Sequence, residues 1–551
     1  MATRYVDSNW NGATTGESSS PFNSLSQLAS VIANGDTIAL KCGSVFRETM
    51  ESEAIEKDNL RIVTYGSGAR PKIVGSDPVT DWTYDATYDV YSTNLGSNVG
   101  GNLTENGVPL SFVAWTTNLA TTSALMTAGS FSFDYNNFDL YVKPAYRIDD
   151  EFEAGCRLYG IDGLPDSFHS GFYLEGIEVV GATRQGIWLH NRGPFEVVDI
   201  VVRIIGGKRD TSFHLGNGIE INRGSSGGIV RDSLFEDIFD SAISPQVYDP
   251  SAYLLQGATV KNNVMRRCGM GGVEVSSQTA DNAITSVQVT HNYAEDIGMN
   301  NWSGDRGGTA YWSANNGGTG SCITGTFFGY NRAKRCKRGY LSGNSYGRNQ
   351  CVGNFFEECE RAFYTSKSIA ASKEQRDVIV GNIVKNCDVG HYQAGSQAQY
   401  TEIFNNTFIN VGVGISLPSN ASAVVTARNN AFVGTGTAFS VVTGTLTETS
   451  NILDTTITAG KTLDGTDEVA SLSAHIDEFG RLARTQSNPL IGSGEVISGA
   501  DSLPDFYGKS QKSPPDCGAI QQDDLRSTMT RSNATRSVAT RRITSRRALA
   551  L

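Results

Sequence analysis

Between about Gly186 and Phe439 the chain repeats a short pattern, in which a small residue precedes a hydrophobic–polar–hydrophobic triplet. Successive copies start 23 to 38 residues apart. Alternation of hydrophobic and polar residues predicts short strands, and a spacing that rarely falls below 24 predicts turns of a coil, some of which carry loops. The copies begin at Gly186, Gly218, Ala242, Gly272, Gly339, Ala362, Gly390, Gly414 and Ala438, with a looser copy at Ala310.

Two further rows of residues keep the same spacing. An Asn precedes an apolar residue at Asn263, Asn292, Asn331, Asn354, Asn382, Asn406 and Asn430. An apolar residue or a Cys comes four or five residues before most triplets, at Phe239, Cys268, Ile297, Cys336, Cys359, Cys387 and Val411. Repeats of this length cannot bury their own apolar face, so they stack into a solenoid. The three rows together predict an all-β fold, a right-handed parallel β-helix, with an Asn ladder at one bend and buried free thiols inside.

The segments before and after this repeat differ in pattern. Phe22, Leu25, Leu28, Val31 and Ile32 recur at helical spacing, which predicts a short amphipathic helix that covers the open edge of the first rung. Alternating residues at 110–115 and 131–142 predict an antiparallel insertion on the flank of the coil. The expected organisation is an N-terminal cap at 1–50, first rungs at 51–79, an inserted β-module at 80–165, a β-helix core at 166–455, a closing segment at 456–525 and an arm at 526–551.

Charge distinguishes the arm from the body. The net charge is −12, and from Arg526 onward there are seven Arg and no acidic residue, so the remainder carries −19. Such a body is a poor partner for nucleic acid, whose phosphates require clustered Lys and Arg. No apolar run is long enough to span a membrane, and the chain does not open on an apolar signal segment. The arm, with Arg every five residues between Ser and Thr, is expected to be extended and to dock on an acidic partner.

Four segments resemble known proteins. The opening at residues 5–49 and the segment Arg61-Ile-Val-Thr-Tyr-Gly to Pro71-Lys-Ile-Val-Gly-Ser resemble the start and first full rung of right-handed β-helix proteins of the pectin-lyase-like superfamily. The stretch from Gly129 to Pro144 is similar to an inserted module of bacterial polysaccharide-degrading β-helices. The stretch from Ser487 to Ile520 resembles their closing segment, in which the chain folds back along the helix. The resemblance implies the fold over residues 5–520.

The middle residues of the triplets form one outward column, because side chains alternate along a strand. The column reads Trp188, Glu220, Ser244, Glu274, Tyr311 or Trp312, Leu341, Tyr364, Tyr392 and Ser416. Glu220 and Glu274 lie two rungs apart, roughly 10 Å between backbones, which suits the acid and base of an inverting glycosidase. Like charge and partial burial would raise the pKa of one of them. The alternative is that both are solvated polar residues on an outer face.

The aromatic members of the column are candidate sugar platforms, namely Trp188, Trp312, Tyr364 and Tyr392. A second group of candidates lies in the loop that begins at Trp302, where Asp305 is a possible catalytic carboxylate and Arg306 a possible substrate contact. Asp240, just before the Ala242 copy, is also within reach of the column. Each Asp has a structural alternative, since Asp in a turn commonly accepts hydrogen bonds from backbone N–H groups.

A basic run at Lys334–Arg338 offers a different chemistry. In polysaccharide lyases of this superfamily a Lys or Arg removes the proton next to a uronate carboxylate, often with calcium. The resemblance therefore implies Lys337 or Arg338 as an alternative lyase base, which neighbouring cations would help by lowering its pKa. The chain contains no recognisable calcium-ligand set, metal-ligand spacing or cofactor motif, so no cofactor is expected, with calcium as an option only for a lyase.

The expected function is that of a phage tailspike-like protein, located on a virion or outside the cell, which binds and cleaves a bacterial surface polysaccharide. Tailspike β-helices are commonly homotrimers, which implies a homotrimer here by analogy. Attachment to a virion tail protein would then fall to residues 526–551. Two alternatives stay open at this point, a polysaccharide lyase acting on a uronate-containing glycan and a non-catalytic glycan-binding adhesin or virion structural protein.

Overall fold

The computed structural model describes residues 1–470 with gaps in loops, and beyond them Leu472, Leu490 and residues 516–519. The gaps are residues 97–100, 149, 164–167, 210–213, 223, 248–254, 278–283, 299–306, 316–322, 344–348, 368–375, 396–398, 419–421, 455–457, 460–462 and 464–466.

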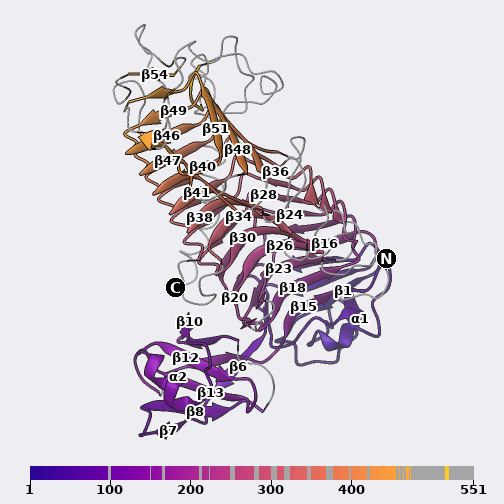
Figure 1. Cartoon of the computed structure of the whole chain (residues 1–551). Helices are drawn as coiled ribbons and strands as arrows, with labels where there is room; N and C mark the ends of the chain where they lie inside the picture. The colour runs from indigo at the N-terminus through magenta and orange to yellow at the C-terminus, as the bar shows by residue number, and fades with distance from the viewer. Residues whose placement is uncertain are drawn as a thin grey trace.

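Three long parallel sheets form the body, which is an elongated right-handed β-helix (Figure 1). Sheet 1 has the order β1 (Thr3–Val6), β2 (Thr37–Lys41), β4 (Arg61–Tyr65), β16 (Phe172–Glu175), β19 (Phe195–Val198), β24 (Ile229–Arg231), β28 (Thr259–Lys261), β32 (Gln288–Thr290), β36 (Phe327–Gly329), β39 (Gln350–Val352), β42 (Asp377–Val380), β45 (Gln399–Phe404), β48 (Ala423–Arg428) and β51 (Thr445–Thr449).

Sheet 2 has the order β15 (Tyr159–Gly163), β18 (Gln185–His190), β23 (Ile219–Asn222), β26 (Ser241–Val247), β30 (Gly271–Ser277), β34 (Thr309–Asn315), β38 (Arg338–Gly343), β41 (Arg361–Lys367), β44 (Val389–Gly395), β47 (Val413–Leu417), β50 (Thr437–Val441) and β53 (Thr458–Ala459).

Sheet 3 has the order β3 (Val45–Phe46), β5 (Lys72–Val74), β17 (Glu178–Val180), β20 (Val201–Ile205), β25 (Leu234–Ile238), β29 (Val264–Arg266), β33 (Tyr293–Glu295), β37 (Arg332–Lys334), β40 (Phe355–Glu357), β43 (Ile383–Lys385), β46 (Thr407–Ile409), β49 (Ala431–Val433), β52 (Ile452–Leu453) and β54 (Glu468–Val469). Each turn of the coil visits sheet 1, then sheet 3, then sheet 2. Like positions therefore stack on like positions along the whole body.

The predicted Asn ladder runs along the bend between sheets 1 and 3. In each step the side-chain oxygen of one Asn accepts two hydrogen bonds from the Asn one rung before. Asn382, for example, accepts them from the backbone N–H of Asn354 at 2.8 Å and from its side-chain amide at 2.9 Å. The ladder continues past Asn430 to Asn451 and ends on Asp467. The residue before each ladder position is repeatedly left-handed, for example Tyr330 at φ 58°. The bend leaves buried backbone groups without partners in the sheets. The Asn side chain is needed at this position because it forms hydrogen bonds with those groups.

The predicted inward row is correct at six of its seven positions. Cys268, Ile297, Cys336, Cys359, Cys387 and Val411 are buried in the central core. Phe239 is the exception, because its ring packs against the inserted module, 6.2 Å from the ring of Phe112. Ile238 takes the inward place, and its carbonyl accepts from the backbone N–H of Gly269, directly after Cys268. The sequence spacing allowed either residue, and the contact with the module decided between them.

The N-terminal end is covered as expected, but with less helix. Only the 3-10 turn η1 (Ser26–Leu28) forms where the amphipathic helix was predicted. Leu25 and Leu28 are nevertheless buried against the first rungs. A second short helix, α1 (Ser52–Ile55), lies beside β15. Arg192 holds it, because its guanidinium donates to the carbonyls of Ile55 and Lys57.

Two small sheets interrupt the coil after β5 and project from its N-terminal end (Figure 1). One contains β6 (Ser76–Val79), β9 (Leu103–Glu105), β10 (Val108–Pro109) and β14 (Phe152–Gly155), and the other contains β7 (Thr83–Asp85), β8 (Val90–Asn94), β11 (Ser111–Phe112), β12 (Ser130–Asp134) and β13 (Asp139–Lys143), with α2 (Leu119–Leu125) beside them. The pairings are antiparallel except that of β11 with β12. Asn102 joins this module to the coil, since its amide donates to the carbonyls of Ala182 and Ile204.

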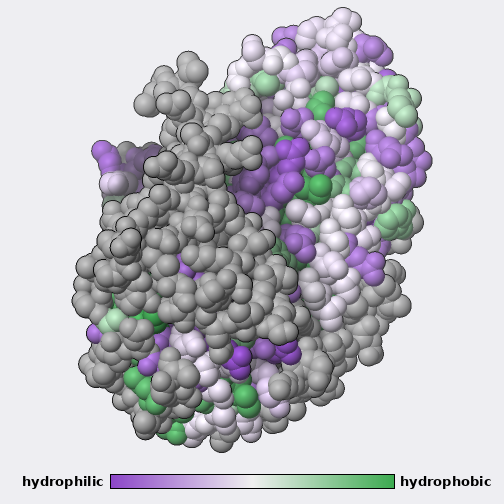
Figure 2. Space-filling view, turned by 90° about the horizontal axis from the view of Figure 1, so that it is seen from above, coloured by the Kyte–Doolittle hydropathy of each residue, from purple (hydrophilic) through white to green (hydrophobic). Residues whose placement is uncertain are grey.

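Residues near the C-terminus lie back on the outer face of sheet 3. Leu490, Cys517 and Ala519 form an apolar cluster with residues of β43, β46, β49 and β52. The backbone N–H of Gly518 donates to the carbonyl of Asn429, and that of Ala519 to the hydroxyl of Thr407. In the view from above, at 90° to Figure 1, much of the described surface is hydrophilic, and the hydrophobic residues form small separate areas (Figure 2). The described helices are all too short to cross a membrane.

Two smaller sheets complete the secondary structure of the described residues. Strands β21 (Lys208–Arg209) and β22 (His214–Leu215) form a hairpin beside the coil. Strands β27 (Leu255–Gln256), β31 (Ile284–Thr285) and β35 (Ile323–Thr324) form a short parallel sheet just before the sheet 1 strands β28, β32 and β36. The chain therefore enters sheet 1 in register in these three rungs.

Candidate active site

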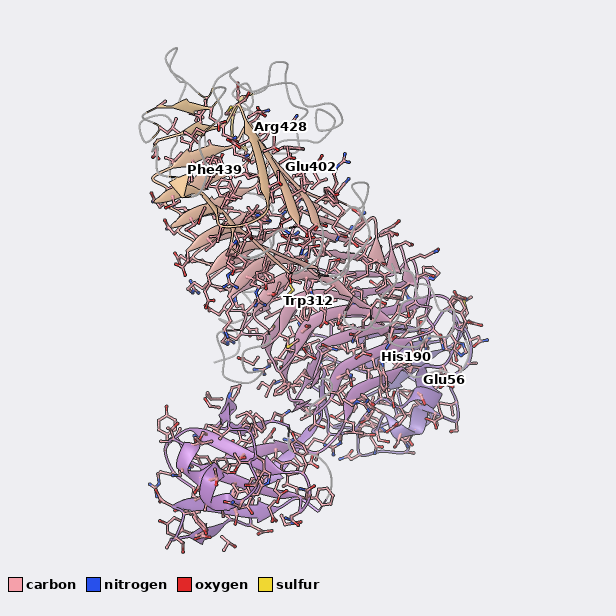
Figure 3. All side chains as sticks on the ribbon, viewed as in Figure 1. Glu56, His190, Trp312, Glu402, Arg428 and Phe439 are labelled. Carbon is pink, nitrogen blue, oxygen red and sulfur yellow. The ribbon has the colours of Figure 1, made fainter. Side chains whose placement is uncertain are left out.

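Sheet 2 carries the predicted outward column in one continuous register. Trp188 pairs with Glu220, Glu220 with Ser244, Glu274 with Trp312, and Trp312 with Leu341. The column then continues through Tyr364 and Tyr392 to Ser416. Of the two residues that the sequence left open, Trp312 is in the column, while Tyr311 is buried inside and donates to backbone carbonyls. Trp312 lies near the middle of the long body (Figure 3).

Glu220 is held by three amide groups. The side chains of Gln185 and Asn217 donate to its Oε2, at 2.8 and 3.2 Å, and that of Asn222 donates to its Oε1 at 3.0 Å. Glu220 is only 2% exposed. The two carboxyl oxygens accept hydrogen bonds from three N–H donors, so the three amides fix the orientation of this side chain.

Glu274 is in a different environment two strands away. It is 7% exposed, and the Ser241 hydroxyl donates to its Oε2 at 2.8 Å. Burial raises the pKa of Glu274 to about 7, with a further contribution from the negative charge of Glu220, while serine hydroxyls oppose the shift. At neutral pH this carboxyl group is therefore available in the protonated form that a general acid requires.

Asp240 is the third carboxyl group of the cluster. It is 4% exposed, and its Oδ1 has no hydrogen-bond partner in the described part of the chain. Burial, followed by the charges of Glu274 and Glu220, raises the pKa of Asp240 well above its usual value. The ionised form of Asp240 is therefore disfavoured relative to an exposed Asp, both by the loss of water and by the neighbouring negative charges.

These three groups exclude the simpler interpretation that the two Glu side chains are solvated. Glu220 on β23, Asp240 directly before β26 and Glu274 on β30 are buried and interact electrostatically on three neighbouring rungs. The hydroxyl of Ser244 lies between the two Glu side chains and donates to the Glu274 carbonyl. The two-strand separation gives about 10 Å between the Glu backbones.

Aromatic side chains flank the cluster on both sides. Before it, Trp188 packs on Tyr159 and His190, and Arg184 lies 5.3 Å from the Trp188 ring. After it, Trp312 packs with Met270 and Leu341. Farther along, the rings of Tyr364 and Tyr392 are parallel, 5.6 Å apart. Trp188, Tyr364 and Tyr392 are partly exposed, whereas Trp312 is only 9% exposed.

The basic run does not form one cluster. Lys334 and Arg335 pair with carboxylates at sheet 3, and Lys337 packs its side chain over Gly308. Arg338 alone reaches the column, where its guanidinium lies 4.7 Å from the Tyr364 ring. Burial lowers the pKa of Arg338, and the adjacent Arg361 lowers it further, while Tyr364 and Glu360 act in the opposite direction. Asp305 and Arg306 lie outside the described residues.

Several residues around the carboxylates were not singled out from the sequence. Gln185, Asn217 and Ser241 each come directly before the small residue of a triplet, and each donates to one of the two Glu side chains. Arg361, the neighbour of Arg338 in register, was also missed. A polar residue at this one position in three successive copies was the signal that could have identified the donors.

Comparisons with known proteins show the fold. A family model described as periplasmic copper-binding protein (NosD) matches residues 251–466, which is less than half of the chain. Comparison with curated protein sequences gives no match. A structure of XylC with xylose aligns with a TM-score of 0.56 at 12% identity, covering 94% of this chain and 98% of that chain.

Two further structures align less closely. A GH136 lacto-N-biosidase from Eubacterium ramulus has a TM-score of 0.46 at 13% identity, covering 85% of this chain and 67% of that chain. Pectate lyase Pel9A has a TM-score of 0.38 at 14% identity, covering 95% and 97%. The chain has the parallel β-helix fold.

The copper named by the family model does not fit the residues that are described. Within the described ranges no three His, Cys, Asp or Glu side chains are arranged to hold a metal ion. His391 is buried inside the coil, where burial lowers its pKa to about 3. The internal Cys residues are core side chains, so no step of a mechanism is assigned to copper.

Proposed function

We propose that this protein binds and cleaves a polysaccharide by carboxylate-mediated glycoside hydrolysis. The observation that carries the proposal is the buried cluster of Glu220, Asp240 and Glu274, set between aromatic side chains on one face of sheet 2. A structural role alone gives no reason to bury three interacting carboxyl groups, because their mutual repulsion and desolvation destabilise the fold. The similar fold of XylC, whose structure contains xylose, supports a carbohydrate ligand.

The different environments assign the roles. Glu274, with a pKa near 7, is the general acid that protonates the leaving oxygen. Glu220, oriented by the amides of Gln185, Asn217 and Asn222, is the base that orients and deprotonates water. Asp240, whose own pKa is raised by burial and by the charges of Glu274 and Glu220, is the third carboxyl group beside this pair. A two-strand separation leaves room for water between acid and base, which favours inversion of configuration.

The test is mass spectrometry of the products formed from a panel of bacterial capsular polysaccharides and lipopolysaccharides. Fragments with one added water are expected, and Glu220→Gln and Glu274→Gln should each lower their rate by about 10² to 10⁴ while binding persists. Glu196→Gln is the matched control, since it removes a carboxylate that pairs with Arg231 on sheet 1. Hydrolysis that survives both site variants contradicts the proposal.

The two alternatives are outcomes of the same experiment. Unsaturated fragments without added water identify a lyase and move the chemistry to Arg338 or Lys337. Glycans that bind without being cut identify an adhesin, in which Trp188, Tyr364 and Tyr392 would still contribute to retention.

We further propose that the target is a bacterial surface polysaccharide and that the protein acts outside the cell as a homotrimeric phage tailspike. The acidic body and the Arg-rich residues 526–551 support this assignment, because the arm has the charge needed to dock on an acidic tail protein. Light scattering after size-exclusion chromatography tests the trimer. Co-purification with phage particles, with and without residues 526–551, tests the attachment.

A further inference from the structure

Two arginines on sheet 2 lack the partners that other arginines of the body have. Arg332, Arg335, Arg266 and Arg267 each form ion pairs with carboxylates at sheet 3 or its bends. Arg338 and Arg361 form no ion pair or side-chain hydrogen bond in the described part of the chain. The charge of Glu360 acts on Arg338, but no carboxylate oxygen there lies within 4.0 Å of either guanidinium.

These two guanidinium groups are also neighbours. Arg338 pairs in register with Arg361 on the next strand, so their backbones are about 4.8 Å apart. Besides burial, the charge of Arg361 lowers the pKa of Arg338, so the two like charges repel, and partial burial strengthens the repulsion. The pair is therefore an unfavourable arrangement in the free protein, and an anion would relieve it.

Aromatic rings hold both groups in place. The Arg338 guanidinium lies 4.7 Å from the Tyr364 ring, and that of Arg361 lies 4.3 Å from the Tyr392 ring and 5.4 Å from the Tyr364 ring. Stacking on an aromatic ring fixes a guanidinium while its N–H edge stays available. Both tyrosines belong to the outward column and are partly exposed.

We propose that Arg338, Arg361, Tyr364 and Tyr392 form a subsite for an acidic sugar, whose carboxylate, sulfate or phosphate binds between the two guanidinium groups. The planar N–H edges of Arg suit such oxyanions, and the tyrosine hydroxyls and ring edges contact the sugar itself. This inference rests on the proposed function, since it gives the substrate class for the same face of sheet 2.

The position of this subsite determines its role. Strands β38 and β41 lie two and three strands beyond β30, which carries Glu274, so the subsite is about 10 to 14 Å from the acid along the helix axis. Its acidic sugar is therefore not the one whose bond is cleaved. Arg338 acts here as a binding group rather than as a lyase base.

The test uses NMR signals of the arginine Nε–H groups, assigned by their loss in Arg338→Gln and Arg361→Gln. The full chain carrying Glu220→Gln is titrated with sodium glucuronate at constant ionic strength, and in parallel with glucose, glucose 6-sulfate and glucose 6-phosphate. We expect saturable shifts of both signals with glucuronate and none with glucose. The sulfate and phosphate arms show which oxyanion binds most tightly.

Variants provide the second measurement. Arg338→Gln with Arg361→Gln should weaken glucuronate binding about tenfold or more, whereas Arg335→Gln removes the same charge at sheet 3 and should leave it unchanged. Shifts no larger than those of Arg335, or equal shifts with every acid and with glucose, overturn the proposal. Because the titrated monosaccharides have no glycosidic bond to cleave, the result does not depend on whether Glu220 is the base.

Discussion

At the scale of single residues, identical side chains in one column differ because of the groups beside them. Glu220 and Glu274 occupy equivalent triplet positions, yet three amides surround the first and hydroxyl groups the second. The sequence predicted the pair, its column and a raised pKa for one member. It could not predict which member, because that depends on donors contributed by neighbouring rungs. The placement of Phe239 failed for the same reason, since a contact from residue 112 is invisible to local spacing.

The raised pKa of Glu274 predicts a pH-dependent stability. The value is 4.5 in the unfolded chain and about 7 in the folded chain, so between these pH values the folded state binds more protons and stability falls as pH rises. Glu274→Gln removes this loss, which is roughly 3 kcal/mol at most. We expect its gain in melting temperature over the parent to be larger at pH 8 than at pH 4.5. An equal gain at both pH values would show that Glu274 titrates normally.

The catalytic role of Glu274 predicts a separate pH effect. A general acid must be protonated, so cleavage should decrease as pH rises through about 7. The pH profile of kcat with the cleaved glycan measures this limb. Activity that is constant from pH 6 to pH 9 would mean that another group donates the proton.

At the scale of elements, the Asn ladder shows how a strand pattern fixes a bend. Each Asn serves as acceptor for the rung before it and donates to the rung after it, as Asn354 does toward Asn331 and Asn382. Its recurrence was visible in the sequence because stacking repeats the same requirement in each rung. The helix predicted at the N-terminus formed only as a 3-10 turn, since burial of Leu25 and Leu28 does not require more.

Removal of one ladder residue should therefore destabilise several backbone groups. Asn354→Ala leaves the Asn331 backbone N–H and amide and the Phe328 carbonyl without their buried partner. We expect a loss of about 2–4 kcal/mol in the free energy of unfolding, measured as a lower denaturation midpoint. Thr447→Ala is the control, because Thr447 is exposed on β51 of the same coil. Equal effects of the two substitutions would mean that the ladder is not a source of stability.

At the scale of the whole molecule, stability and chemistry belong to different regions. The carboxylate cluster lies on β23, directly before β26, and on β30, whereas Leu490, Cys517 and Ala519 cover β43, β46, β49 and β52. A solenoid transmits stability mainly between neighbouring rungs. Damage at one end should therefore stay local.

Leu490→Ala tests this separation. It removes a fully buried side chain from the cluster that includes Ile409 and Ile452, and Leu→Ala changes of this kind cost about 2–5 kcal/mol. We expect faster hydrogen exchange in β46, β49 and β52, with unchanged exchange in β23 and β30. A uniform increase along the whole coil would instead indicate one cooperative unit.

The sequence by itself determined the coil, its outward column and its ladders, because each rung meets the same environment and so repeats the same residue types. The tertiary structure alone decided which column residues are buried, which carboxyl group is protonated, and which arginines remain unpaired. Those properties depend on groups 24 to 35 residues apart, such as Gln185 beside Glu220 or Ser241 beside Glu274. The burial and the charge state of a side chain depend on all such neighbours, whereas the sequence repeat reflects only the requirements that every rung has in common.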